Sequence, residues 1–348
     1  GLIPLHKLWC FMMFLESLQS RQDLLKTSSL EITMGYPARL RAMSKQLRAQ
    51  PSQLQNTASI NCSPLSMLTV KKKSDLRQAL QNARLVGQKI GLVPTMGNLH
   101  EGHLRLIEAA IANCHYTVVT IFVNPLQFGR NEDINNYPRT LELDKRLLKK
   151  SGCDLLFAPN NSEMYGFTDF IKTNMIGSSL TRNHCGKTRP GHFEGVATIV
   201  TKLFNLILPQ HAYFGLKDFQ QFRIIEQLVA DLDFAIQLHG LPTVREGSGL
   251  ALSSRNSRLS SKQRQIAPAL FEELQQTERL IRQGNQEYRQ VESEAKHSLS
   301  LRGLKTEYFN ICNARSLEMA SQNDTDLVIL AAAFVGDVRL IDNITLTI

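Results

Sequence analysis

From Met67 onward, segments with helical spacing of apolar residues alternate with short segments that are apolar throughout. Apolar positions recur every three or four residues, as in amphipathic helices, at 74–87, 104–113, 141–150, 197–206 and 219–230. The short apolar segments, which are typical of buried strands, lie at 89–94, 117–123, 154–158 and 212–214. Strands separated by helices of this length build a parallel sheet with right-handed crossovers. We therefore predict an α/β fold with a Rossmann-like, doubly wound parallel sheet.

The pattern changes after Pro242. Two long polar helices are predicted near 262–283 and 286–300, followed by strands at 306–312, 327–335 and 338–342. Gly336 and Asp337 separate the last two strands and are a hairpin signal. We expect a larger doubly wound domain over 67–242 and a smaller α+β C-terminal domain over 243–348.

Residues 1–66 differ in composition from the rest of the chain. From Ile32 to Ser66 there is no acidic residue, and four basic residues lie among Ser, Gln, Asn and Pro. Such a segment cannot bury enough apolar area to offset its ordering entropy, so we expect little fixed structure there. We interpret it as a leader or translated upstream sequence before a start near Met67. A mitochondrial transit peptide is the alternative to a cytoplasmic protein, whereas a secretory signal at Leu8–Leu15 would lack a clear cleavage site.

Charge and cysteine content limit the classes of ligand, partner and scaffold that we expect for this chain. Lys and Arg number 40 against 31 Asp and Glu, a net charge of +9 that suits phosphate- or carboxylate-bearing ligands. No stripe of Lys and Arg with interleaved aromatics occurs, so we expect no nucleic-acid partner. No apolar run approaches the ~18 residues of a membrane helix, so we expect no membrane partner. The six cysteines include no C-x-x-C pair, which argues against a disulfide scaffold.

A segment rich in glycine and histidine follows the first apolar run of this pattern. It reads Val-Pro-Thr-Met-Gly-Asn-Leu-His-Glu-Gly-His over 93–103. Ligands of open parallel sheets bind outside the carboxyl ends of strands, and the free amides at a helix start attract phosphate. His100 and His103 are three residues apart and therefore project from the same side of a helical turn. Two imidazoles placed there can donate hydrogen bonds to a phosphate in the transition state.

A metal site and a purely structural helix cap are the alternatives for this histidine pair. A zinc-protease helix needs H-E-x-x-H, whereas H-E-G-H has a spacing of three and no third ligand is evident. Two histidines that only cap a helix are the commoner structural case. The flanking Gly97 and Gly102 let the backbone approach a ligand closely, which favours phosphate chemistry.

Two further clusters also follow predicted strands or join the two predicted domains. In Phe-Gly-Leu-Lys-Asp-Phe-Gln-Gln (214–221), Lys217 offers a cation for phosphate, Asp218 can accept from ribose hydroxyls and Gln221 suits a hydroxyl or carboxylate. In Gly-Leu-Ala-Leu-Ser-Ser-Arg-Asn (249–256), two hydroxyls and Arg255 can wrap phosphates. An ordinary capped helix is the alternative for the first cluster. His192, beside an aromatic residue, is more often a packed structural histidine.

Seven motifs follow one another along the chain. They are P-T-M-G-N-L-H-E-G-H, F-V-N-P-L-Q-F, Y-P-R-T, R-P-G-H-F-E-G-V, K-D-F-Q-Q, G-L-A-L-S-S-R-N and R-L-I-D-N. In this order and spacing they resemble the pantothenate synthetase (pantoate:β-alanine ligase) family. The resemblance runs from about Met67 to Ile348 and does not include residues 1–66.

The resemblance implies an ATP-dependent ligase of the HIGH-type nucleotidyltransferase superfamily. In such an enzyme the carboxylate of pantoate attacks the α-phosphate of MgATP, giving pantoyl adenylate and pyrophosphate, and β-alanine then displaces AMP to form pantothenate. The family is usually a homodimer. The C-terminal domain would close over the ATP site.

The resemblance also assigns residues. His103 would be the catalytic histidine with His100 as its partner, and Lys217 and Arg255 would act beside them. The ATP site would comprise Met96, Gly97, Asn98, Leu99, His100, Glu101, Gly102, His103, Gly215, Leu216, Lys217, Asp218, Val244, Leu252, Ser253, Ser254 and Arg255. Gln127, Gln221 and Asn124 would bind pantoate and β-alanine, and Asp144 would contribute to a Mg²⁺ site.

Three positions depart from the family pattern: Leu216 stands where Glu is common, Ser248 where Asp is common and His184 where Leu is common. We expect a small effect of Leu216, because ATP would be met there mainly by backbone and Lys217. Ser248 and His184 should affect loop geometry rather than reaction type. Two other functions compete with ligation. A nucleotidyltransferase for a phosphorylated acceptor would need a second cationic site, whereas Gln127 and Gln221 are neutral. A nucleic-acid-binding module without catalysis would need a basic stripe.

Overall fold

The computed structural model describes residues 67–129, 134, 137–166 and 179–348. The predicted extension over 1–66 lies outside the described residues. Residues 66–348 form one compact unit by their contacts, so the domain division after residue 242 stays a prediction. Among the helices of the described part of the chain, none is both long and apolar enough to cross a membrane.

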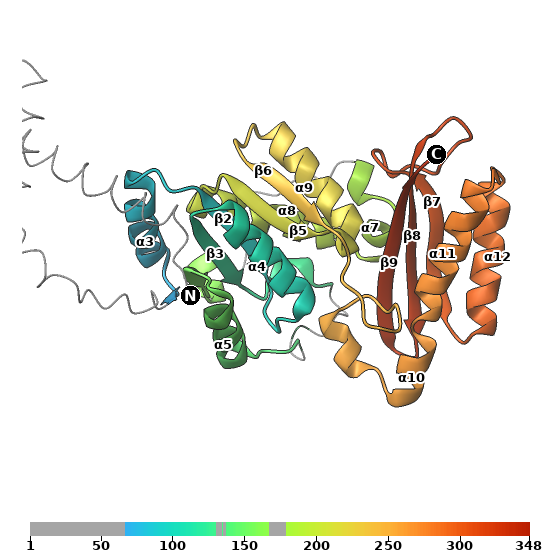
Figure 1. Cartoon of the computed structure of the whole chain (residues 1–348), viewed down its shortest axis with the longest axis horizontal. Coiled ribbons are helices and arrows are strands. Elements are labelled where there is room, and N and C mark those ends of the chain that lie inside the picture. The colour runs from blue at the N-terminus through green and yellow to red at the C-terminus, as the bar shows by residue number, and fades with distance from the viewer. Residues whose placement is uncertain (1–66, 130–133, 135–136, 167–178) are drawn as a thin grey trace, which may run out of the picture. The chain divides into compact units, whose positions relative to one another are not determined.

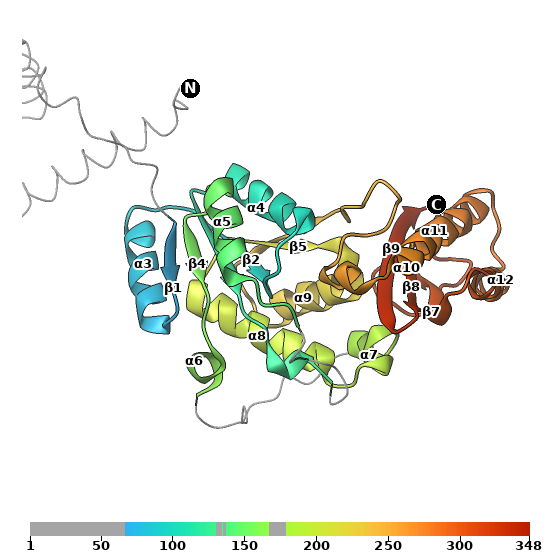
Figure 2. The same ribbon diagram turned by 90° about the horizontal axis from the view of Figure 1, so that it is seen from below.

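Six parallel strands form the larger sheet, in the order β1-β4-β3-β2-β5-β6. Figure 1 labels β2, β3, β5 and β6 of this sheet, and Figure 2 labels β1 and β4. They are β1 (Leu68–Val70), β2 (Ile90–Thr95), β3 (Tyr116–Ile121), β4 (Leu155–Phe157), β5 (His211–Gly215) and β6 (Gln237–Leu241). Leu92 of β2 pairs with Val118 of β3 on one side and with Ala212 of β5 on the other. After β2, the chain adds β3 and β4 on one side of that strand and then β5 and β6 on its other side. The topological switch point, where ligands bind in such sheets, therefore lies at the carboxyl ends of β2, β3 and β5.

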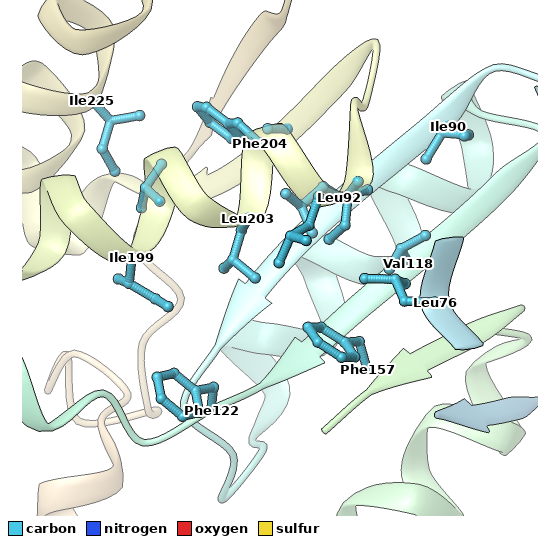
Figure 3. Packing of buried hydrophobic residues seen from close by; sticks show 14 of the residues in the cluster. Leu76, Ile90, Leu92, Val118, Phe122, Phe157, Ile199, Leu203, Phe204 and Ile225 are labelled. Atoms are coloured by element: carbon cyan, nitrogen blue, oxygen red, sulfur yellow. The ribbon is translucent and has the colours of Figure 1, made fainter. Parts of the chain in front are cut away.

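Helices cover both faces of this sheet (Figure 2). α3 (Lys73–Leu85), α8 (His192–Ile207) and α9 (Phe219–Asp231) pack on one face, and α4 (Glu101–Asn113) and α5 (Leu141–Ser151) on the other. Successive strand residues point to opposite faces, so Leu92 joins the first core and Val93 the second. Figure 3 shows the first core, where Leu203 and Phe204 of α8 pack on the sheet. Burial on both faces explains why the central strands are apolar throughout.

The second sheet is antiparallel and has three strands, β7 (Lys305–Asn313), β8 (Asp326–Val335) and β9 (Val338–Thr347). α11 (Ala269–Arg282) and α12 (Tyr288–Leu301) pack on one of its faces. Its other face meets the helices of the larger sheet, where Val328 and Leu330 contact a cluster that includes Cys185 and Phe219. The predicted fold class is therefore confirmed: a doubly wound parallel sheet is joined to a smaller C-terminal antiparallel sheet with helices.

Shorter elements complete the described structure. The short α-helices are α6 (Asn161–Tyr165), α7 (Cys185–Thr188) and α10 (Ser261–Ile266). The 3₁₀ helices are η1 (Pro125–Gln127), η2 (Ser179–Thr181), η3 (Leu216–Asp218) and η4 (Ser254–Arg258).

Besides these short elements and the earlier start of α8 at His192, the structure differs from the predicted elements at the edges of the parallel sheet and in the C-terminal part. β1 and β6 were not predicted, and they are the two edge strands of the parallel sheet; β1 has only three residues, and β6 is partly polar with no fully buried residue. The helix predicted over 262–283 is divided into α10 and α11 at Pro268, which has no N–H to continue the helical hydrogen bonds. β9 extends beyond residue 342 because it pairs with β8 as far as Thr347, opposite Asp326.

Candidate functional site

A cavity of about 260 Å³ lies at the predicted switch point of the parallel sheet. Its wall includes Thr95 at the end of β2, Asn124 shortly after β3 and Gly215 at the end of β5. The segment 252–255, which follows the parallel sheet in sequence, closes another part of the wall. Three strand ends and one later segment thus converge on a single hollow, as expected for the ligand site of an open parallel sheet.

His100 and His103 both line this cavity and also cap helix α4. Nδ1 of His100 accepts from the backbone N–H of Gly102 at 3.2 Å, and Nδ1 of His103 accepts from the N–H of His100 at 3.3 Å. The ring centroids are 4.1 Å apart. Because each Nδ1 is an acceptor, a neutral ring carries its proton on Nε2. The cap therefore fixes both imidazoles as Nε2–H donors.

Electrostatics keeps these rings neutral near pH 7. Burial lowers the pKa of His103 to about 3, with a further lowering by His100 and Lys217 that Asp218 partly opposes. Burial and the charge of Lys217 also lower the pKa of His100. Neutral imidazoles avoid the cost of a buried unpaired charge and still present an N–H to an anionic ligand.

The turn before this helix is organised around Asp144. Gly97 and Asn98 both have left-handed backbone, with φ of 82° and 52°. The N–H groups of Asn98 and Leu99 donate to the Asp144 carboxylate at 3.0 and 2.9 Å. Consecutive amides that converge in this way form an anion-binding nest, which here holds an anion of the protein itself. Asp144, fully buried in the first turn of α5, thereby fixes the backbone that leads into His100.

The second phosphate-binding candidate lies on η3, between β5 and α9. Lys217 and Asp218 both line the cavity, and Asp218 is exposed to it. The surrounding protein opposes ionisation of Asp218, but the charges of Lys217 and Arg255 outweigh this and lower its pKa. Asp218 is therefore an anion among cations and suits a hydroxyl donor such as a ribose.

The third candidate segment, on η4, comes from the chain after the parallel sheet. The side-chain hydroxyl of Ser253 accepts from the N–H of Arg255 at 3.2 Å and caps the 3₁₀ helix. Ser254 is hydrogen-bonded to Tyr137, which also lines the cavity. Burial raises the pKa of Tyr137, so its hydroxyl stays protonated at neutral pH.

Neutral amides occupy another part of the wall. Gln127 donates from Nε2 to the sulfur of Met96 at 3.0 Å and accepts at Oε1 from Asn124 at 3.1 Å. Asn124 is itself held by Tyr165, whose hydroxyl donates to its Oδ1 at 2.6 Å. These contacts fix the orientation of the Gln127 amide. Gln221 lines the same cavity from the first turn of α9.

The chain matches the family model described as Pantoate-beta-alanine ligase over residues 68–345. It belongs to the pantoate–β-alanine ligase family. A pantothenate synthetase of Marinobacter nauticus is 48% identical to it over 281 residues, which cover 81% of this chain and 100% of that protein. A pantothenate synthetase of Pseudomonas fluorescens is 49% identical over 280 residues, which cover 80% and 98% of the two chains.

Solved structures of this ligase family have the same fold. The crystal structure of the pantothenate synthetase from Thermus thermophilus is 41% identical with a TM-score of 0.75 and covers 80% of this chain and 99% of its own. That of the pantoate-beta-alanine ligase from Francisella tularensis, complexed with Beta-gamma ATP and Beta-alanine, is 33% identical with a TM-score of 0.67 and covers 80% and 97%.

Most of the residues expected to form the site of this ligase lie together. Those that line the cavity are Met96, His100, Gly102, His103, Asn124, Gln127, Gly215, Lys217, Asp218, Gln221, Val244, Leu252, Ser253, Ser254 and Arg255. The cavity wall does not include Gly97, Asn98, Leu99, Glu101, Leu216 or Asp144. The first three form the turn held by Asp144, and Glu101 pairs with Arg105 on the exposed side of α4.

The carboxylate of Asp144, which the resemblance assigned to a Mg²⁺ site, is engaged by neighbouring protein groups. Both of its carboxylate oxygens accept hydrogen bonds, and the Thr140 hydroxyl approaches them at 3.2 and 3.3 Å. Within the described part of the chain, no group of three or more His, Cys, Asp or Glu side chains could hold a metal ion. Asp144 therefore holds the turn that leads into His100, and its contribution to a Mg²⁺ site stays a prediction.

Several cavity residues were not among the predicted site residues. Nδ1 of His192 contacts the Gln127 carbonyl oxygen at 2.7 Å, and Nε2 contacts Arg189 at 3.0 Å. Arg189 also donates to the Gln127 carbonyl at 3.4 Å, and both residues line the cavity. The motif R-P-G-H-F was the available signal, but a histidine beside an aromatic residue has no local feature that separates a packed ring from a cavity ring. Tyr137, from the Y-P-R-T motif, was also missed, because nothing in that motif shows whether the tyrosine ring faces a cavity.

The three departures from the family pattern have local structural partners. Leu216 joins the apolar core clusters, and its carbonyl accepts from Asn343. The Ser248 hydroxyl accepts from the N–H of Leu250 at 3.4 Å. His184 is buried, with Nε2 at 2.8 Å from the Leu317 carbonyl oxygen and Nδ1 at 2.9 Å from Asn310, and burial lowers its pKa. Each departure is therefore accommodated by loop or core contacts of this ligase.

Proposed function

We propose that this chain joins pantoate to β-alanine in an ATP-dependent reaction, forming pantothenate, AMP and pyrophosphate through pantoyl adenylate. The observation that carries the proposal is the composition of one cavity. Imidazole, ammonium and guanidinium donors from three separate segments gather there with two neutral glutamines, in a chain that belongs to the pantoate–β-alanine ligase family.

The first half-reaction forms a bond between a carboxylate oxygen of pantoate and the α-phosphorus of ATP, while the bond from that phosphorus to the bridging oxygen breaks and pyrophosphate leaves. Negative charge shifts toward the phosphate oxygens, so fixed donors around them lower the barrier. We assign this task to Nε2–H of His100 and His103 together with Lys217 and Arg255. Their fixed geometry avoids reorganisation when the charge moves.

The second half-reaction forms a C–N bond between the amine of β-alanine and the acyl carbon of the adenylate, while the C–O bond to AMP breaks and the amine releases a proton. We assign pantoate binding to Gln127 and Gln221, because neutral amides match hydroxyl groups and a carboxylate without adding charge. Asn124 holds Gln127 in place. The two amides are neutral, so they match a hydroxyl-bearing carboxylic acid better than a phosphorylated acceptor.

Mg²⁺ would enter with the ATP phosphates, which together with water supply most of its ligands and neutralise part of their charge. Asp218 is the acidic residue among the described residues of the cavity wall, and we match it to a ribose hydroxyl of ATP. The remaining part of the wall is neutral or cationic and therefore suits the phosphates themselves.

Measurement of AMP release with pantoate and ATP, with and without β-alanine, tests the proposed reaction. We expect AMP release that depends on β-alanine, together with pantothenate detected by mass. Absence of that dependence would exclude ligation. Nucleotide transfer to a phosphorylated acid in place of pantoate would support the alternative enzyme class.

We also propose, from the family resemblance and its bacterial relatives, a cytoplasmic homodimer in which the segment after residue 242 closes over ATP. Light scattering of the purified full chain tests the assembly, and fractionation of the producing cells tests the location. A monomer at micromolar concentration would contradict the assembly proposed here.

A further inference from the structure

The motif R-L-I-D-N on strand β9 has no role in the reaction described above. Its last two residues, Asp342 and Asn343, are adjacent on β9 and do not line the cavity. Both are nevertheless buried polar residues, with 5% and 8% of their surface exposed. Buried polar side chains in a strand are costly unless they satisfy specific partners, so their partners are informative.

Asn343 holds the segment that carries Lys217. Its Nδ2 donates to the carbonyl oxygens of both Leu216 and Lys217, each at 2.9 Å. These carbonyls belong to η3, whose Lys217 and Asp218 side chains reach the cavity. One amide group therefore anchors the backbone of η3, whereas the side chain of Lys217 stays directed to the cavity.

Asp342 holds the other phosphate-binding segment. Its carboxylate forms a two-point ion pair with Arg245, with oxygen–nitrogen distances of 2.5 and 2.9 Å. Arg245 also donates to the Gly249 carbonyl at 3.1 Å and stacks on Phe271, 3.5 Å from the ring centroid. It belongs to a short antiparallel turn in which Arg245 pairs with Ala251.

That turn leads directly into the cavity wall. Val244 and Leu252, which are joined by a backbone hydrogen bond of 2.9 Å, line the cavity on either side of the Arg245–Ala251 pair. Ser253 to Arg255 follow without a break. Strand β9 accordingly contacts both η3 and η4, the elements that carry Lys217 and Arg255.

We propose that Asp342 and Asn343 are positioning residues that set the spacing between the Lys217 turn and the Ser253–Arg255 segment. This inference rests on the proposed function, because it takes ATP as the ligand that both segments bind. The two anchors are neighbours in one strand, and pairing of Ala331 with Asp342 and of Leu330 with Asn343 fixes that strand to β8. They cannot move independently, so the cations they support approach one nucleotide at a fixed separation.

A double-mutant cycle between Asn343 and Lys217 tests this coupling. The variants are Asn343→Ala, Lys217→Ala and both together in the full chain. The readouts are kcat/KM for ATP and the affinity for Mg²⁺ with α,β-methylene-ATP. If Asn343 acts through Lys217, we expect Asn343→Ala to lower kcat/KM at least tenfold in the parent and less than threefold in the Lys217→Ala background. Equal losses in both backgrounds, or a loss below threefold in the parent, would overturn the proposal.

A matched control separates positioning from general loss of stability. Asn313 also lies in the C-terminal sheet, and its amide donates to Asp324 at 2.6 Å in a part of the described structure that does not line the cavity. Asn313→Ala should therefore change kcat/KM less than threefold. If Asn343→Ala does not fold, Asn343→Asp keeps the size and places an oxygen against the two carbonyls, and the same non-additivity is expected.

Failure of the proposed reaction is distinguishable from failure of this inference. A parent chain that binds α,β-methylene-ATP but forms no pantothenate would exclude ligation. The double-mutant cycle could then still be measured through the affinity for α,β-methylene-ATP, and it would still test the coupling between Asn343 and Lys217. A parent chain that binds no nucleotide would overturn both.

Discussion

At the scale of single residues, His100 and His103 combine two functions that the sequence presented as alternatives. Their Nδ1 atoms cap α4, as the structural interpretation predicts, and both rings line the cavity, as phosphate chemistry requires. The cap determines which nitrogen carries the proton. A structural hydrogen bond therefore prepares the donor that we assign to catalysis.

Replacement of His103 by Asn separates these two functions. The Asn side-chain oxygen can take the place of Nδ1 in the cap, but no atom replaces Nε2. We expect His103→Asn to lower turnover on the order of a hundredfold or more, as loss of one transition-state donor does, with a melting temperature close to that of the parent. Single-turnover adenylate formation measures the effect, and a change below about threefold would contradict the assigned role.

Replacement of Asp144 by Asn tests whether this residue holds the turn or a metal ion. An amide keeps the shape but offers only one acceptor oxygen, so one of the buried amides of Asn98 and Leu99 loses its partner, at a cost of about 1–3 kcal/mol. We expect turnover to fall at least tenfold while the Mg²⁺ concentration for half-maximal rate stays within twofold. A large increase in that concentration would instead support a contact between Asp144 and Mg²⁺.

At the scale of elements, the position of Gln127 depends on how closely α8 approaches η1. A Cβ on Gly195 of α8 would lie 2.3 Å from the Leu126 carbonyl oxygen and 2.7 Å from the Gln127 nitrogen. These are backbone atoms, which cannot move without shifting the whole turn. The glycine therefore sets the distance between a helix and a substrate-binding turn.

We expect Gly195→Ala to displace η1, to raise the KM for pantoate about tenfold and to destabilise the fold by about 1–3 kcal/mol, as overpacking does. Gly247→Ala is the matched control, because a Cβ there meets no atom within 4 Å. Initial-rate kinetics with pantoate and thermal unfolding of both variants measure the difference. Equal KM values for pantoate in the two variants would contradict a role of Gly195 in positioning Gln127.

At the scale of the whole molecule, histidines link folding to pH. Burial is the main cause that lowers the pKa of five described histidines, namely His100, His103, His184, His211 and His239. Below the ordinary value of about 6.5, the unfolded chain therefore binds more protons than the native one. The native state loses stability as the pH falls, because its rings stay neutral while those of the unfolded chain become charged.

We expect the free energy of unfolding to fall between pH 6.5 and about 4, with a slope of up to about 1.4 kcal/mol per pH unit for each excess proton. His103, whose pKa is lowered to about 3, should contribute over this entire interval. His103→Asn should therefore make the slope shallower. Urea unfolding at a series of pH values without nucleotide measures it, and an unchanged slope would contradict the burial of the neutral ring.

Features that depend on local chemistry could be predicted from the order of residues alone. Continuous apolar runs located the central strands, β2 to β5, because burial on both faces of a sheet requires apolar residues throughout. Apolar residues at helical spacing located the helices between these strands. Glycine and histidine at strand ends located the motifs of the cavity. The same patterns missed β1 and β6, since an edge strand is short or partly polar and carries no such run.

Contacts between residues that are far apart in the chain became known only from the folded molecule. Asp144 lies 46 residues from Asn98, and Asn343 lies 126 residues from Lys217, yet each forms a direct hydrogen bond to its distant partner. In the pair Gln220 and Gln221, the first is buried against the Cys185 N–H and the second faces the cavity. No local pattern encodes such partners, because they are set by how helices and sheets pack after the local elements have formed.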